Sequence, residues 1–170
     1  MIDLHSHILP GLDDGPATRQ EALDLAREYV KIGFTHVVAT PHCIFGSAWE
    51  IEAEEVCAAV DALNGDILEE GLPLRVFTGM ELGLGPELPR KLTEGVALPL
   101  AGSNCVLVEL PFQMLPRGWD EILFEIKARG YRVLLAHPER CEQVIQDPDI
   151  LAGAVGTGSN GPVRKRTTAG

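Results

Sequence analysis

The strongest constraint on the fold is a regular alternation of short apolar segments with longer amphipathic ones. Strand-like and helix-like segments follow one another, and in chain order they cover residues 1–7, 20–31, 35–41, 50–69, 74–81, 86–93, 105–110, 119–129 and 131–136. Period-two and period-3.6 patterns joined by short connections are typical of strand–helix units in a parallel sheet or β/α barrel. The sequence therefore predicts an α/β fold.

Length and apolar content place most of the chain in one domain. With 170 residues and 45% hydrophobic composition, the chain can bury a core of its own. Apolar periodicity stops near Val155, and residues 156–170 are rich in glycine and carry a basic cluster. We expect one domain at 1–155, followed by a disordered tail at 156–170.

The charge of the chain excludes some partners. A formal net charge of −11 repels nucleic-acid backbones and anionic membranes. No apolar run approaches the roughly 18 residues of a membrane span, and Met1 leads directly into Asp3 and His5 where a signal peptide would be basic and then apolar. The sequence thus predicts a cytoplasmic protein with no membrane span and no nucleic-acid partner.

The cysteines do not form a recognisable site. Cys43, Cys57, Cys105 and Cys141 form no C-x-x-C pair, and none has an arginine six positions later. Zinc knuckles and dithiol redox motifs require the first spacing. A thiolate phosphatase would need the second, so any phosphatase chemistry must proceed without a cysteine nucleophile.

Histidines and carboxylates recur at the C-terminal ends of the predicted strands, the edge at which β/α barrels carry their chemistry. They are His7, His42, Glu81, Glu109 and His137. His5 lies two positions before His7, so both imidazoles share one face of the first strand and can chelate a divalent metal. Taken singly, each histidine is equally well explained by a structural role.

Glu81 and Glu109 interrupt or close very apolar strands. Burying an unpaired carboxylate costs several kcal/mol, roughly, unless a cation or a hydrogen-bond network compensates it. A metal cluster would compensate both residues. A salt bridge to a basic residue is the alternative for each.

Two loops add polar groups at the same edge. Asp14 lies in the turn 13–15 just after the first strand, where it is either a helix cap or a metal ligand and proton-transfer group. Arg140 follows His137, and its planar fork suits two phosphate oxygens, unless it simply pairs with Glu139. Together these residues predict a polynuclear metal site for phosphoester hydrolysis, with manganese, iron and zinc all compatible.

The segment Met1-Ile-Asp-Leu-His-Ser-His-Ile-Leu-Pro-Gly-Leu-Asp-Asp-Gly15 resembles the opening of the capsule-type, manganese-dependent protein-tyrosine phosphatases of Gram-positive bacteria. These enzymes belong to the polymerase-and-histidinol-phosphatase (PHP) superfamily. The resemblance covers roughly the first 150 residues and continues through residues 39–42, 79–82, 107–112 and 136–140. Such a series of motifs in this order is specific.

The resemblance implies a distorted β/α barrel with up to three metal ions, most readily manganese. It also implies hydrolysis of phosphotyrosine on the tyrosine-rich tail of a polysaccharide-export kinase. By motif, the implied metal ligands are His5, His7, His42, Glu81, Glu109 and His137, with Glu81 as the bridging carboxylate. Arg140 would bind the phosphate, and Asp14 would assist proton transfer.

The chain departs from this pattern near its end. The family pattern continues past position 150 with further strands and an Asp-x-His pair, whereas this chain has no histidine after His137. We therefore expect a barrel that is incomplete at the C-terminus, a truncated or altered end, and an apolar surface that favours self-association. A small-molecule phosphatase, such as one for histidinol phosphate, and a metal-binding fragment with impaired turnover are the alternatives.

Overall fold

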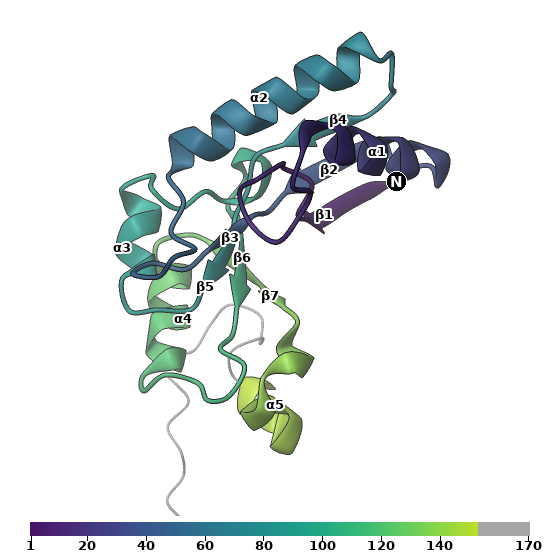
Figure 1. Ribbon diagram of the computed structural model, residues 1–170. Helices are drawn as coiled ribbons and strands as arrows, with labels where there is room; N and C mark the ends of the chain where they lie inside the picture. Colours follow the sequence, from purple (N-terminus) through teal and green to yellow (C-terminus); the bar gives the residue numbers. More distant parts are fainter. Residues whose placement is uncertain (153–170) are drawn as a thin grey trace, which may run out of the picture.

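The strands follow one another across the fold in the order of the sequence. The computed structural model describes residues 1–152 and contains two all-parallel sheets with strand orders β1-β2-β4 and β3-β5-β6-β7 (Figure 1). The strands are β1 (Ile2–Ser6), β2 (His36–Ala39), β3 (His42–Cys43), β4 (Arg75–Phe77), β5 (Glu81–Gly83), β6 (Cys105–Glu109) and β7 (Arg132–Ala136). The predicted α/β class and parallel pairing are confirmed.

The division into two sheets has a local cause. The predicted strand 35–41 is split into β2 and β3 by Thr40 and Pro41, and proline has no N–H for a ladder hydrogen bond. Thr40 still donates to the Ser6 carbonyl at 2.8 Å, and the Pro41 carbonyl accepts from Glu81 at 3.0 Å. The chain therefore passes from one sheet to the other without leaving the strand direction.

Helices connect the strands close to the predicted positions, and one further helix, which was not predicted, follows the last strand. They are α1 (Arg19–Lys31), α2 (Ala53–Glu69), α3 (Leu88–Thr93), α4 (Trp119–Ala128) and α5 (Glu142–Gln146), with short 3₁₀ turns at Leu100–Gly102, Pro138–Arg140 and Pro148–Leu151. α1 and α2 pack together beside β4, and α3 and α4 pack together beside β7 (Figure 1). α1 begins at a capping box in which Thr18 and Glu21 each bond the other's backbone N–H.

The two faces of the strands differ in how well they are covered. Successive residues of a strand point to opposite faces of the sheet. Val37 therefore lies in the main core with the helices, and Val38 lies in a smaller cluster with Leu107. On β1, Ile2 and Leu4 are 64% and 48% exposed. Because Ile2 pairs in register with His36, two residues before Val38, this exposed apolar surface continues the face of the smaller cluster.

A closed barrel is not present in the part of the chain that the structure describes. β1 lies at one end of the first sheet and β7 at one end of the second, and each pairs with a single neighbouring strand and not with the other. The predicted tail at 156–170 lies outside the described residues, so its disorder stays a prediction. Among residues 1–152, no helix has the length and apolarity needed to cross a membrane.

Asn64 stabilises the exposed side of β4, the last strand of its sheet. Its side-chain amide donates to the Val76 carbonyl and accepts from the Val76 N–H, both at 2.9 Å. Val76 is buried, so both of its backbone groups would otherwise lack a partner away from water.

We predict that Asn64→Ala lowers the free energy of unfolding by about 1–3 kcal/mol, because it leaves two buried backbone groups unsatisfied. Denaturant unfolding followed by circular dichroism measures this loss. Asp61→Ala, an exposed change on the same helix, is the matched control and should have little effect. Equal stabilities of the two variants would contradict this role of Asn64.

Candidate metal centre

The ends of neighbouring strands deliver the predicted site residues to one place. His42 and Glu81 are register partners on β3 and β5, and His5 lies near the end of β1. A pocket of about 410 Å³ is lined by His5, His7, Asp14, His42, Glu81, His137 and Arg140. Every predicted site residue lines this pocket except Glu109, which lies behind it in contact with His42.

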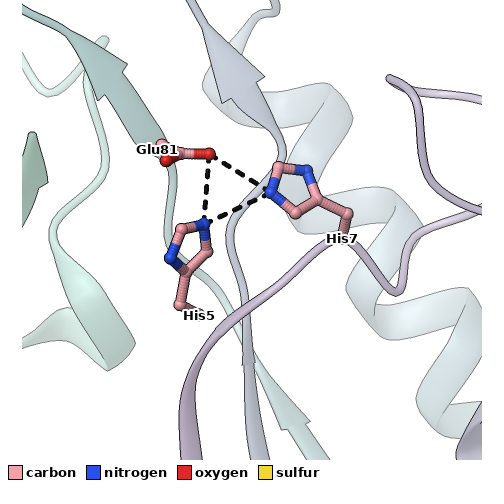
Figure 2. A group of neighbouring side chains, drawn as sticks. All are labelled: His5, His7 and Glu81. Carbon is pink, nitrogen blue, oxygen red and sulfur yellow. Dashed lines mark hydrogen bonds and ion pairs between the residues drawn. The ribbon is translucent and has the colours of Figure 1, made fainter. Parts of the chain in front are cut away.

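Glu81 contacts three histidines of the site. Its Oε2 lies 3.1 Å from His5 Nε2, 3.2 Å from His7 Nε2 and 3.3 Å from His42 Nδ1. The two histidine Nε2 atoms are themselves 3.3 Å apart, so the three side chains converge on one point (Figure 2). Glu81 is only 1% exposed, which removes water as its solvating partner.

Several nitrogen and oxygen atoms that could bind a metal are buried at this point and lack a hydrogen-bond partner. Among residues 1–152 these are His42 Nδ1, Glu81 Oε1, Glu81 Oε2 and Glu109 Oε1. Unpartnered buried polar atoms are costly, whereas atoms bound to a cation are not. Ligand atoms about 2.1 Å from a divalent ion lie roughly 3.0–3.4 Å from each other. The observed separations match this spacing, so these residues fit a metal.

The candidate ligands form three overlapping sets. Within each set the ligand atoms lie within 4.8 Å of one another, and the sets are His5–His7–Glu81, His7–Asp14–His42 and His42–Glu81–Glu109. Because His7, His42 and Glu81 each belong to two sets, the arrangement suits neighbouring ions that share ligands. Mixed nitrogen and oxygen donors are compatible with manganese, iron and zinc.

Asp13 orients His7 for this role. Its Oδ2 lies 2.5 Å from His7 Nδ1 and also accepts from the His42 backbone N–H at 3.1 Å. A proton on Nδ1 that is directed at Asp13 leaves the Nε2 lone pair facing Glu81. Gly15 completes the loop, since a Cβ at this position would meet the His7 carbonyl oxygen at 2.2 Å.

Contacts between opposite charges in the site shift the pKa values of His7 and Glu81. Burial lowers the pKa of His7, but the hydrogen bond to Asp13 and the contact with Glu81 outweigh burial and raise that pKa to about 10. Burial likewise raises the pKa of Glu81, but His5 and His7 outweigh it, and that pKa falls to about 2. The site therefore favours positive charge, and a divalent cation competes with the proton for the imidazole nitrogens.

His137 and Arg140 form the other wall of the pocket. His137 has left-handed backbone angles of φ 43° and ψ 48° ahead of Pro138, a conformation that costs about 1–3 kcal/mol. Its ring lies 4.9 Å from the His5 ring, outside the three ligand sets. Glu139 lies 3.5 Å from His137 Nδ1, and within residues 1–152 Arg140 forms no ion pair. The guanidinium is therefore free to bind an anion.

Two positioning contacts were not predicted from the sequence. Strict alternation places Asp3 beside His5 and His7, but the register of β1 shifts between Asp3 and Ser6. Tyr29 on α1 donates to Asp3 at 2.7 Å, its hydroxyl is also hydrogen-bonded to Ser6 Oγ at 2.9 Å, and Asp3 does not line the pocket. For Asp13 the sequence predicts only a turn. Its place next to Asp14 and just after the H-x-H pair does, however, indicate a residue close to the site.

A parallel α/β fold with this set of candidate ligands is of the PHP type. The chain belongs to the family described as capsular polysaccharide synthesis, CpsB/CapC, whose model matches residues 1–165. The predicted membership is therefore confirmed.

Individual relatives agree with this assignment. The chain is 32% identical over 170 residues to the tyrosine-protein phosphatase YwqE of Bacillus subtilis, covering all of this chain and 66% of that protein. It is 27% identical over 159 residues to the putative tyrosine-protein phosphatase CapC of Staphylococcus aureus, covering 94% and 62%. The chain thus spans slightly under two thirds of these relatives.

A solved structure shows the same fold. A chain from the crystal structures of YwqE from Bacillus subtilis and CpsB from Streptococcus pneumoniae, metal-dependent tyrosine phosphatases, matches with a TM-score of 0.86 and 34% identity. The match covers 91% of this chain and 62% of that one.

We predict that Asp13→Asn weakens divalent-metal affinity about 10- to 100-fold, because His7 loses the carboxylate that fixes its tautomer. Competition with a chromogenic chelator measures the affinity. Asp24→Asn, on the exposed face of α1, is the control and should leave it unchanged. Unchanged affinity in a correctly folded Asp13→Asn protein would show that Asp13 does not position His7.

Proposed function

We propose that this protein is a metal-dependent phosphomonoesterase that hydrolyses phosphotyrosine in proteins. The observation that carries the proposal is a set of buried nitrogen and oxygen atoms that lack hydrogen-bond partners within residues 1–152, directly beside a pocket wall with Arg140, which forms no ion pair in the same described part of the chain. Cations and an anion are thereby held side by side, which is the requirement for phosphate hydrolysis. Relatives that are named tyrosine-protein phosphatases support the choice of substrate class.

The metal ligands in this proposal are His5, His7, His42, Glu81, Glu109 and His137. Bound divalent ions, most readily manganese and up to three, supply positive charge that polarises phosphate oxygens and makes a neighbouring water more acidic. Glu81 keeps His5, His7 and His42 at short range, and the buried Glu109 contacts the same Nδ1 atom of His42 as Glu81 does.

Arg140 and Asp14 act on the substrate itself. The Arg140 fork binds two phosphate oxygens and aligns the phosphorus with the metal ligands. Asp14 Oδ1 lies 3.5 Å from His7 Nδ1 and 3.8 Å from His42 Nε2, and its side chain is largely exposed. From this position it can transfer a proton to or from groups in the pocket.

The cysteines support a mechanism without a covalent intermediate. Cys43 and Cys141 are buried, and none of the four free cysteines lines the pocket. Burial also raises the pKa of the Cys43 thiol, which disfavours the thiolate. Water is therefore the nucleophile in our proposal.

The proposed substrate is the tyrosine-rich tail of a kinase of polysaccharide export, and the proposed setting is the cytoplasm. Membership of a capsular-synthesis family supports the first choice, and four free cysteines fit the second. A small-molecule phosphatase of the same superfamily remains the second candidate, because the pocket would accept any small phosphate monoester. A third candidate is a metal-binding fragment with impaired turnover. The exposed face of β1 also suits self-association of the chain.

We predict that the protein with added Mn²⁺ hydrolyses a phosphotyrosine peptide and p-nitrophenyl phosphate, and that excess chelator abolishes both activities. Glu81→Gln should lower turnover by roughly 100-fold or more, since it removes the shared ligand.

Replacing each cysteine with serine should preserve most of the turnover. Bound metal without hydrolysis of any phosphate monoester would instead establish the non-catalytic fragment, and size-exclusion chromatography reports self-association.

We predict that Arg140→Lys lowers kcat/KM by roughly 5- to 150-fold, because an ammonium group cannot replace two parallel hydrogen bonds to phosphate. Steady-state kinetics at limiting substrate measures the loss. Arg75→Lys, an exposed change at the start of β4, is the matched control and should be neutral. An unchanged kcat/KM for the Arg140 variant would place this residue outside the phosphate site.

A further inference from the structure

Trp49 stands beside the metal pocket and has no role in the chemistry described above. Its ring lies edge-on to the His42 ring, with centroids 5.6 Å apart and planes 64° apart. His42 Nδ1 also lies 3.3 Å from Glu81 and 3.4 Å from Glu109, so the indole packs against the ring of a candidate metal ligand. Trp49 is 39% exposed, which leaves part of its surface open to a bound molecule.

The loop that carries Trp49 is held by its own hydrogen bonds. The Trp49 carbonyl accepts from the Ile44 N–H at 3.1 Å, and its N–H donates to Ser47 Oγ at 3.0 Å. The Glu50 carboxylate accepts from the Gly46 N–H at 2.8 Å. These bonds fix the ring next to His42 before any ligand arrives, which lowers the entropic cost of binding to it.

Core packing does not explain the position of Trp49. Its loop neighbours Phe45 and Ile51 pack in the main core, whereas Trp49 belongs to neither of the hydrophobic clusters formed by residues 1–152. An exposed indole that is held rigidly beside a polar pocket is typical of a contact for a ligand with an apolar part.

We propose that Trp49 forms an aromatic subsite that binds the ring of the phosphorylated tyrosine while the phosphate occupies the metal pocket. The inference rests on the proposed function and adds a specificity-determining residue to it. An aryl phosphate places its ring just outside the phosphate site, on the side where the indole is open. Alkyl phosphates, including phosphoserine, offer no ring to stack there.

Binding measurements test the subsite without requiring turnover. Calorimetry on the Mn²⁺-loaded protein compares phenyl phosphate with methyl phosphate, which share the phosphate and differ in the ring. Trp49→Leu should weaken phenyl phosphate roughly 3- to 10-fold and leave methyl phosphate unchanged. Trp49→Phe should keep most of the affinity, and Phe124→Leu, an exposed change on α4, should have no effect.

A spectroscopic readout locates the contact. The chain has two tryptophans, so in a Trp119→Phe background the emission comes from Trp49 alone. Phenyl phosphate should change this emission at concentrations at which methyl phosphate does not. If the protein also hydrolyses monoesters, Trp49→Leu should raise KM for aryl substrates with kcat nearly unchanged, because the ring contact is equal in ground and transition states.

Three results would overturn the subsite. Equal weakening of phenyl and methyl phosphate would show that Trp49 acts on the phosphate site, and loss of bound metal in Trp49→Leu would show that it supports His42. Unchanged phenyl phosphate affinity would remove Trp49 from recognition altogether. Absence of turnover refutes the proposed function alone, since the two ligands are still compared by binding.

Discussion

The structure depends on how the carboxylate of Glu81 is compensated. This side chain is almost completely buried, and its oxygens lack hydrogen-bond partners within residues 1–152. A bare buried carboxylate would cost several kcal/mol, roughly, and would be expelled or protonated. Three imidazoles from β1, its following loop and β3 surround it instead, so positive charge gathers from separate segments. Assembly of the sheet edge therefore brings together the groups that compensate this carboxylate.

Most of the fold could be predicted because it rests on local patterns. Apolar alternation and amphipathic periodicity depend on neighbours in sequence, and most strands and helices lie where these patterns placed them, although the predicted strand 74–81 forms β4 and β5 in different sheets and α5 was not predicted. What escaped prediction depends on contacts between segments. Pro41 divides one predicted strand between two sheets, and the Asn64 amide bonds the edge of β4. Neither effect has a signature in periodicity, and closure of the predicted barrel is absent from residues 1–152.

The site was predictable to the extent that strand ends meet. The sequence places His42 and Glu81 at the C-terminal ends of their strands, whereas in the structure they begin β3 and β5, just after the ends of β2 and β4, and are direct register partners there. The supporting groups follow another logic. The roles of Asp13 and Trp49 depend on loop conformations, and the contact between Tyr29 and Asp3 depends on an irregularity in β1. Sequence reasoning predicted residues that the structure brings to one pocket, and it overlooked those that hold them in place.

The sequential order of the strands has a consequence for biosynthesis. Within each sheet, every strand after the first pairs with a neighbour that has already left the ribosome, so each sheet can grow in the direction of translation. His5 and His7 emerge first, but they meet Glu81 only after β5 has been made. A nascent chain thus carries the two histidines before the carboxylate that they contact has been made. Cation capture would then mark the moment at which the growing polypeptide commits to its tertiary structure.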